Sequence, residues 1–320
     1  MPILEVEHLK KYFPVTSGVF LRQSGAIHAV DDVSFSVARG ETLGLVGESG
    51  CGKTTLGRCI MGLHTPTSGH IRLDGEAMTR LSASQRKAFA AKVQMIFQDP
   101  YESLNPRQTV RQILQEKFTI HGHSPGKEDI NALLNQVNLN TDCLLKYPHE
   151  FSGGQRQRIG IARAVSMSPE LIICDEPVSA LDVSVQSKIL NLLLYLQQKL
   201  GLTYVFISHD LSVVRHMSDR IIVMYLGRIM EMADADTLYR SPRHPYTRAL
   251  LDAVPVPDPT VSRNHTPLQG EVPSAENTPV GCRFNTRCTH AVDICFNKTP
   301  VLKPAQNDTS HLTACHLFYA

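Results

Sequence analysis

The 320-residue sequence carries almost no excess of charge of either sign. Its 32 lysine and arginine residues are balanced by 30 aspartate and glutamate residues, which gives a formal net charge of +2. Proteins that bind the nucleic-acid backbone usually show a clear basic excess. The composition therefore gives no indication of a nucleic-acid partner.

Long apolar segments are also missing. No run approaches the roughly 18 apolar residues that a membrane-spanning helix needs. Glu5 and Glu7 stand where a secretory signal would place its apolar stretch. We therefore expect a cytosolic chain that does not span a membrane, and the 42% of hydrophobic residues suffice for a sizeable core and about two domains.

Disulfides are not expected, although the chain contains eight cysteines. Cytosolic cysteines are normally thiols or metal ligands. Cys51, Cys59, Cys143 and Cys174 are scattered and are best explained as local packing or loop residues. The remaining four crowd into the last 40 residues.

One glycine-rich stretch fits the phosphate-loop pattern of Gly, four residues, Gly, Lys and then Ser or Thr. It consists of Gly47, Glu48, Ser49, Gly50, Cys51, Gly52, Lys53, Thr54 and Thr55. A buried strand is expected before it, at 43–46, and a helix after it, which is the context that this motif requires. The stretch predicts a bound nucleoside triphosphate, with backbone N–H groups and Lys53 on the phosphates and the Thr54 hydroxyl on Mg²⁺.

The segments before the phosphate loop predict two strands, at residues 3–6 and 33–37. The second alternates with period two, which indicates one buried face and an antiparallel pair, and we expect a mixed sheet to begin here. Tyr12 and Phe13 lie between the two strands. Either ring could stack on an adenine, and a packing role is about equally compatible with the sequence.

Beyond a turn at Asp74-Gly75, a strand at 93–97 ends at Gln98. Residues 98–107 contain two prolines and several turn formers, so we expect a loop ordered by its contacts, and a partner surface is plausible there. Residues 107–150 predict a helical insert from apolar residues at helical spacing. His121-Gly122-His123 in its middle is interpreted as a surface turn without a metal.

A second anion site is predicted where Ser152, Gly153, Gly154 and Gln155 begin a helix. A single bound triphosphate does not explain two such surfaces. Residues 171–174 then form a short apolar strand that ends at Asp175 and Glu176. This arrangement places the Asp175 carboxylate on Mg²⁺ and the Glu176 carboxylate beside an attacking water. His209 follows a core strand at its carboxyl end, where α/β sheets bind ligands.

Together these motifs resemble the ATP-binding cassette (ABC) ATPases over roughly residues 3–250. The resemblance identifies Gln98 as the Q-loop, 151–155 as the signature, 171–176 as the Walker B strand, Asp182 as the D-loop and His209 as the switch histidine. Phe151 departs from the usual leucine, and Cys174 from a common aliphatic residue, with little consequence. The implied fold is α/β, a P-loop ATPase with a mixed-sheet core and a helical subdomain at about 99–158.

In this family two ATPase subunits hold two ATP molecules, each between the phosphate loop of one subunit and the signature of the other. The resemblance implies Thr54, Asp175 and Gln98 around Mg²⁺. It implies Glu176 as general base, His209 at the γ-phosphate, and Phe13 or Tyr12 on the adenine.

A narrower resemblance rests on 98–107, on His244-Pro245-Tyr246-Thr247 and on the cysteine-rich tail. These are similar to ATPase subunits of peptide and nickel importers, most of all the second ATPase of dipeptide and oligopeptide permeases. That family implies a peripheral subunit on the cytoplasmic side of the bacterial inner membrane. Its partners would be a sister ATPase, two permease subunits and, indirectly, an extracytoplasmic peptide-binding protein.

Other functions remain open at this point. Nickel or glutathione import fits the same family, and an exporter fits the tail and the 105–107 segment less well. A soluble cassette ATPase in translation or DNA repair is the rival from another class. Such relatives usually carry tandem cassettes or a long coiled-coil insertion, in place of a short insert between Gln98 and Ser152.

The expected domains are residues 1–240, the ATPase, and 241–320, an extension that holds 10 of the 19 prolines. Cys282, Cys288, Cys295 and Cys315 are separated by five, six and nineteen residues. This spacing matches neither common zinc sites nor the bacterial ferredoxin run, so a four-thiolate site and free thiols are about equally compatible with it. The resemblance to peptide-importer tails favours a [4Fe–4S] cluster.

Overall fold

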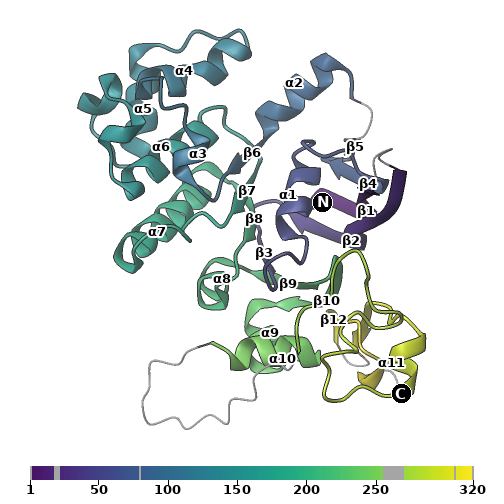
Figure 1. Ribbon diagram of the computed structural model, residues 1–320. Coiled ribbons are helices and arrows are strands. Elements are labelled where there is room, and N and C mark those ends of the chain that lie inside the picture. Colours follow the sequence, from purple (N-terminus) through teal and green to yellow (C-terminus); the bar gives the residue numbers. More distant parts are fainter. Residues whose placement is uncertain (1, 18–21, 79–80, 255–269, 306–307, 319–320) are drawn as a thin grey trace, which may run out of the picture. The chain divides into compact units, whose positions relative to one another are not determined.

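The structure, a computed structural model, describes residues 2–17, 22–78, 81–254, 270–305 and 308–318 (Figure 1). The chain divides into two compact units, each assembled from separated stretches. The first unit consists of Met1–Ile3, Val37–Thr42 and Thr79–Phe206, and the second of Leu4–Ser36, Leu43–Met78 and Ile207–Ala320. No described helix is both long and apolar enough to cross a membrane.

The first unit is mainly helical, with three strands of the larger sheet. Its elements are α2 (Ala83–Lys92), β6 (Val93–Ile96), α3 (Pro100–Ser103), α4 (Val110–Ile120), α5 (Lys127–Gln136), η1 (Thr141–Leu145), η2 (Pro148–Glu150), α6 (Gly153–Val165), β7 (Leu171–Asp175), α7 (Val183–Leu200) and most of β8 (Thr203–Ile207). β7 lies between β6 and β8, and β6 and β7 are parallel, with Val93 opposite Leu171. Every residue of these three strands is buried, which explains their continuous apolar sequence.

The second unit contains the N-terminal strands, the phosphate loop and the whole C-terminal segment. Its elements are β1 (Pro2–Ser17), β2 (Arg22–Ala38), β3 (Thr42–Val46), α1 (Lys53–Ile60), β4 (Ser68–Leu73), β5 (Glu76–Ala77), α8 (Leu211–Met217), β9 (Arg220–Tyr225), β10 (Arg228–Asp234), α9 (Ala235–Arg240), α10 (Pro245–Asp252), α11 (Asp293–Asn297), β11 (Lys303–Ala305), β12 (Asp308–Thr313) and η3 (His316–Phe318).

The N-terminal strands form a sheet of their own, of four strands in the order β2-β1-β4-β5. β1 and β4 are antiparallel, with Leu4 opposite Leu73. The antiparallel pairing expected for the strand at 33–37 stays a prediction, whereas the expectation that these strands begin the mixed sheet is wrong. Val33, Phe35 and Val37 on one face of β2 are buried, so this face of the sheet packs against the core.

The mixed character belongs to the larger, eight-stranded sheet. In the second unit, β3 runs parallel to β9, whereas β9, β10, β12 and β11 are antiparallel neighbours in that order. The mixed α/β fold is therefore confirmed. β12 extends the sheet beside β10, so the segment after residue 240 shares a unit with the phosphate loop. The division at residue 240 stays a prediction, since the compact units follow other bounds.

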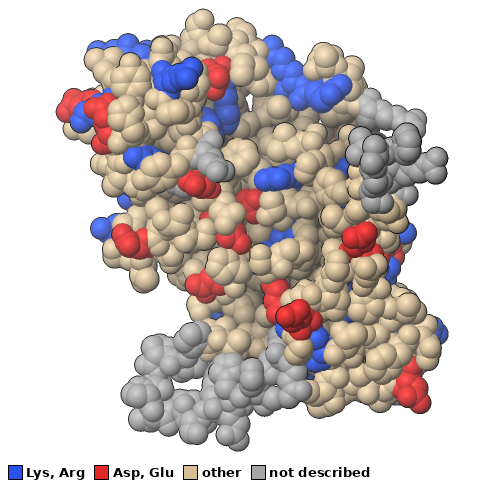
Figure 2. Space-filling view, viewed as in Figure 1, with Lys and Arg blue, Asp and Glu red and all other residues tan. Residues whose placement is uncertain are grey.

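One local expectation needs correction. Residues 98–107 are not wholly irregular, because α3 forms a short helix whose N-cap is Asp99, with the carboxylate accepting a hydrogen bond from the Tyr101 N–H. The helical insert at 107–150 is confirmed as α4, α5 and two 3₁₀ turns. His121 ends α4 and is followed by a turn, as expected. On the face seen in Figure 2, acidic and basic side chains are intermixed.

Candidate functional site

The phosphate loop connects β3 to α1 in the second unit, as the motif requires. Gly47, Gly50 and Gly52 have φ values of +149°, +76° and +106°. Residues with side chains rarely adopt such conformations. Gly52 is the N-cap of α1 and makes no side-chain cap, and the start of such a helix is suited to bind an anion through its backbone N–H groups.

Two of these glycines also allow a close approach of neighbouring backbone. A Cβ on Gly47 would lie 2.2 Å from the Met224 carbonyl oxygen, and one on Gly52 would lie 2.0 Å from that of Ala29. Gly50 has open space instead. Gly50 is therefore needed for its backbone conformation alone, whereas Gly47 and Gly52 are needed for packing as well.

Lys53 is the only buried lysine among the described residues. Its Nζ donates to the carbonyl oxygens of Gly47 at 2.7 Å and Glu48 at 3.0 Å. The ammonium thus lies inside the loop, where it can exchange these oxygens for phosphate oxygens. Burial raises the pKa of the neighbouring Cys51 thiol, which keeps that side chain neutral beside the cation.

Glu48 is held from outside the loop by contacts that the sequence did not reveal. Its carboxylate accepts two hydrogen bonds from Arg287, with N–O distances of 2.7 and 3.1 Å. Its N–H donates to the Tyr246 hydroxyl at 2.9 Å. Both partners are far along the chain, so only the tertiary structure could identify them.

Tyr12 and Phe13 both lie on β1 and are partly buried. The Tyr12 ring stacks on His28 with centroids 4.2 Å apart, and its hydroxyl donates to Asp31 at 2.5 Å. Phe13 meets His64 edge-on. Each ring already has an aromatic neighbour, so which of them stacks on adenine stays a prediction.

Asp31 is 3% exposed and forms the centre of an ion-pair cluster. Arg228 and Arg283 both donate to one of its oxygens, at 2.8 and 2.7 Å. Burial alone would raise the pKa of Asp31, but the Tyr12 hydroxyl and the two arginines outweigh it and lower the pKa to about 2. The carboxylate is therefore ionised at every physiological pH.

The predicted signature begins α6 in the first unit. Ser152 is the N-cap: its hydroxyl accepts from the Gln155 N–H, and the Gln155 side chain accepts from the Ser152 N–H. This capping box fixes the first turn. Ser152 and Gln155 are exposed, so the helix start is accessible to an anion.

Gly154 is required by packing. A Cβ there would lie 2.5 Å from the Val185 Cγ1 on α7. Asp182 is the N-cap of α7 and makes no side-chain cap hydrogen bond. Val183 beside it is 79% exposed.

Gln98 and Glu176 lie in contact, although the sequence analysis gave them separate roles and did not predict that they meet. The Gln98 Nε2 donates to the Glu176 Oε2 at 2.9 Å. Glu176 has a φ of +48°, which is uncommon for a residue with a side chain and often marks a functional site. Ser179 stabilises this turn by donating from its N–H and its hydroxyl to the Glu176 carbonyl oxygen. Asp175 is buried at the end of β7.

The predicted residues thus fall into two groups. The first unit holds Gln98, Ser152–Gln155, Asp175, Glu176 and Asp182, and the second holds Tyr12, Phe13, the phosphate loop and His209. His209 is exposed and lies two residues after the end of β8.

The four tail cysteines line one small cavity in the second unit, together with His244 and Phe284. All eight cysteines of the chain are free thiols. Burial first, and then the other three tail thiols, raise the pKa of Cys282 to about 11. The donors suit a soft metal or a cluster in number and kind. However, within the described ranges no group of three or more His, Cys, Asp or Glu side chains is arranged to hold a metal ion.

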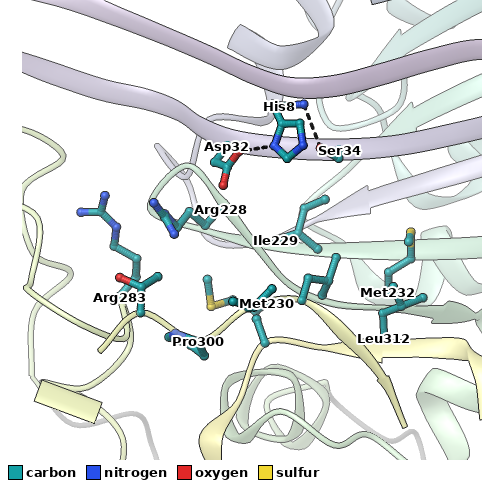
Figure 3. Close-up of a pocket in the computed structure, with 14 residues that line it drawn as sticks. His8, Asp32, Ser34, Arg228, Ile229, Met230, Met232, Arg283, Pro300 and Leu312 are labelled. Carbon is teal, nitrogen blue, oxygen red and sulfur yellow. Dashed lines mark hydrogen bonds and ion pairs between the residues drawn. The ribbon is translucent and has the colours of Figure 1, made fainter. Parts of the chain in front are cut away.

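A larger pocket of about 490 Å³ lies between β1, β2, β10 and the tail (Figure 3). Its walls are mostly apolar, as at Met230 and Leu312. The charged or titratable side chains at its polar end are already paired, His8 with Asp32 and both arginines with Asp31. No sequence motif pointed to this pocket, and its paired charges single out no ligand.

Comparisons with known proteins agree with the motifs. The family described as ABC transporter matches residues 30–179, and the oligopeptide/dipeptide transporter C-terminal region matches residues 230–295. The oligopeptide transport ATP-binding protein AppF of Bacillus subtilis (strain 168) is 53% identical, over 99% of this chain and 97% of AppF. The putative oligopeptide transport ATP-binding protein YkfD of the same organism is 51% identical, over 99% of this chain and 96% of YkfD.

A solved structure supports the same fold. The dimeric ATP-binding cassette MJ0796, described in a post-hydrolysis state bound to ADP and Pi, is 27% identical, with a TM-score of 0.64. The alignment covers 72% of this chain and 98% of that one.

The phosphate-loop geometry gives a matched pair of variants. Gly50→Ala should destabilise the chain by about 1–2 kcal/mol, the cost of a left-handed residue with a side chain. Gly52→Ala should cost about 1–3 kcal/mol more, because the Ala29 carbonyl must also move. Urea unfolding of both variants measures the difference. Equal losses would contradict the packing role of Gly52.

Proposed function

This chain belongs to the ABC transporter ATPases, and we propose that it is the ATP-hydrolysing subunit of an importer for dipeptides or oligopeptides. The observation that carries the proposal is the match of residues 230–295 to the oligopeptide/dipeptide transporter C-terminal region, in a chain that also contains the cassette. AppF, which is named as an oligopeptide transport protein, aligns over nearly the full length.

Hydrolysis is assigned to the residues at the ends of the buried strands. Lys53 and the loop N–H groups would bind the phosphates, and the Thr54 hydroxyl and the Asp175 carboxylate would hold Mg²⁺, which neutralises charge on the transferred phosphoryl group. Glu176 would take the proton from the attacking water, with Gln98 orienting its carboxylate through the hydrogen bond at 2.9 Å. His209 would contact the γ-phosphate.

The second anion site is assigned to a nucleotide held by a partner subunit. Its support is the exposed start of α6 at Ser152, a second anion-binding helix start that the Lys53 site does not need. The cassette MJ0796 forms a dimer. We propose that this chain pairs with a sister ATPase, so that each ATP lies between a phosphate loop and the partner's signature.

The permease contact is assigned to the surface around α3. Tyr101 is 64% exposed, and the Arg156 guanidinium lies 3.7 Å from its ring centroid. Arg156 also donates to the carbonyl oxygens of Pro148 and His149, next to the exposed Leu145. Because Arg156 lies on α6, a displacement of this surface would also move the signature helix.

We assign the protein to the cytoplasmic side of a bacterial membrane, as a peripheral subunit on two permease subunits. An extracytoplasmic binding protein would deliver the substrate. Nickel or glutathione remain alternative substrates, because the transported molecule contacts those partners and not this chain. Copurification with its membrane partners would distinguish the substrates.

The tail thiols are proposed to bind a structural [4Fe–4S] cluster. Four cysteines at one cavity support this proposal, and the cluster would staple a segment that has little apolar periodicity. The thiols must lose their protons to become ligands, so binding should be favoured by higher pH.

Glu176→Gln tests the general base. The amide can still accept the hydrogen bond from Gln98 but cannot take a proton, so turnover should fall by about 10²-fold or more while ATP binding persists. Steady-state hydrolysis of the assembled transporter is the measurement. Glu170→Gln, just before the same strand, is the matched control and should stay near wild type. Near-normal hydrolysis by Glu176→Gln would remove this assignment.

Ser152→Ala tests the shared nucleotide site. The separated chain should bind ATP as the wild type does, whereas the assembled transporter should lose turnover. Thr109→Ala removes the same kind of capping box from α4 and controls for the loss of a helix cap, about 1 kcal/mol. If Ser152→Ala abolished binding in the separated chain as fully as Lys53→Ala, the shared site would be wrong.

Anaerobic purification tests the cluster. The chain should be brown with about four irons, and Cys295→Ser should lose both, while Cys143→Ser in the other unit keeps them. Stoichiometric zinc in colourless protein would keep the four-thiolate site and overturn the cluster. Four freely alkylated thiols on a folded tail would overturn both.

A further inference from the structure

The tail segment from Cys282 to Cys288 carries two buried arginines that reach two different parts of the second unit. Arg283 directly follows Cys282, and Arg287 directly precedes Cys288. The arginine residues are 9% and 8% exposed. Two buried guanidinium groups on so short a segment need anionic partners, and each of them has one.

Arg287 reaches the phosphate loop. Its two terminal nitrogens form a bidentate pair with the Glu48 carboxylate, at 2.7 and 3.1 Å. This geometry fixes the direction of the side chain as well as its position. Glu48 is itself a loop residue, and its carbonyl oxygen accepts from Lys53. Arg287 is therefore connected, through the single residue Glu48, to the lysine that is assigned to phosphate.

Arg283 is connected to Tyr12, one of the two rings considered for stacking on adenine. Its guanidinium donates to Asp31 at 2.7 Å, and the other oxygen of Asp31 accepts from the Tyr12 hydroxyl. Arg228 shares the same carboxylate and comes from β10 (Figure 3). Arg283 is thus connected to Tyr12 through one carboxylate.

The segment that carries both arginines is well anchored. Phe284 is 1% exposed and packs against Tyr225, Tyr246 and His244. The Cys282 N–H donates to the Cys295 carbonyl oxygen at 2.8 Å. A rigid segment can impose its geometry on its partners, whereas a mobile one would follow them.

We propose that Arg283 and Arg287 are positioning residues for nucleotide binding, Arg287 for the phosphate loop through Glu48 and Arg283 for the adenine side through Asp31 and Tyr12. The proposal rests on the assignment of ATP to the phosphate loop, and its Arg283 part rests also on Tyr12 as the ring that stacks on adenine. It gives the tail a direct role in the nucleotide site of its own chain. The segment begins at Cys282 and ends at Cys288, and both of these cysteines line the thiol cavity. A change in either cysteine therefore alters the nucleotide site.

The two roles are separated by two competitors of a fluorescent ATP analogue, MgATP and magnesium tripolyphosphate, measured on the full chain. Arg287→Gln should raise the Kd of both competitors by about 10-fold, since it loosens the phosphate loop that both use. Arg283→Gln should raise the Kd of MgATP alone, because tripolyphosphate has no base to stack. Equal losses for both competitors in both variants would indicate general destabilisation and overturn the assignment.

Two variants keep this test decisive. Glu48→Gln removes the same ion pair by an isosteric change and should reproduce Arg287→Gln, also where the latter folds poorly. Arg72→Gln removes an exposed ion pair to Glu7 with a similar distance, 2.8 Å, and should leave both affinities unchanged. If Glu48→Gln bound both competitors like the wild type, Arg287 would have no positioning role.

Failure of the proposed function gives a different result. If Lys53→Ala still bound MgATP normally, the phosphate loop would not be the nucleotide site. If Lys53→Ala lost binding while the arginine variants kept both affinities, only the positioning role would be wrong.

The thiol connection has its own test. Cys288→Ser should weaken MgATP binding in the wild-type background but not in Glu48→Gln, where the ion pair next to Cys288 is already lost. No effect, or the same effect in both backgrounds, would contradict transmission through Arg287.

Discussion

The ion pair between the buried Arg287 and the partly buried Glu48 is the contact on which the phosphate loop depends. The loop is built from glycines with left-handed backbone, which are permissive and do not hold one conformation by themselves. The carboxylate of Glu48 and its N–H are both held by side chains from the C-terminal segment, Arg287 and Tyr246. A loop that must present backbone N–H groups to phosphates is therefore shaped by residues that lie 198 and 239 positions away from Glu48.

This dependence explains why the tail shares a compact unit with the phosphate loop. A buried ion pair contributes little net stability when both partners are present, but removal of one partner leaves an uncompensated charge. The pair thus favours one arrangement of loop and tail over others. The same principle holds at Asp31, where two arginines and the Tyr12 hydroxyl share one carboxylate.

The sequence predicted the elements that short-range patterns determine. The phosphate loop, the strand that ends at Asp175 and the helix that begins at Ser152 were all located from spacing and residue type. The hydrogen bond between Gln98 and Glu176 was not predicted, because it joins segments far apart in the sequence. The separate N-terminal sheet was missed, because period-two alternation reveals a buried face but not the partner strand. Arg283, Arg287 and the clash that requires Gly154 were missed because each depends on contacts between distant segments.

The central claim is that this chain is an ATP-hydrolysing subunit of a peptide importer. Reconstitution with its permease subunits and binding protein in lipid vesicles tests that claim most directly, by uptake of a labelled dipeptide or oligopeptide. The account predicts uptake that requires ATP on the side of this chain and hydrolysis that rises with the peptide-loaded binding protein. Hydrolysis that continues unchanged without the permeases, with no peptide uptake under any of these conditions, would contradict it.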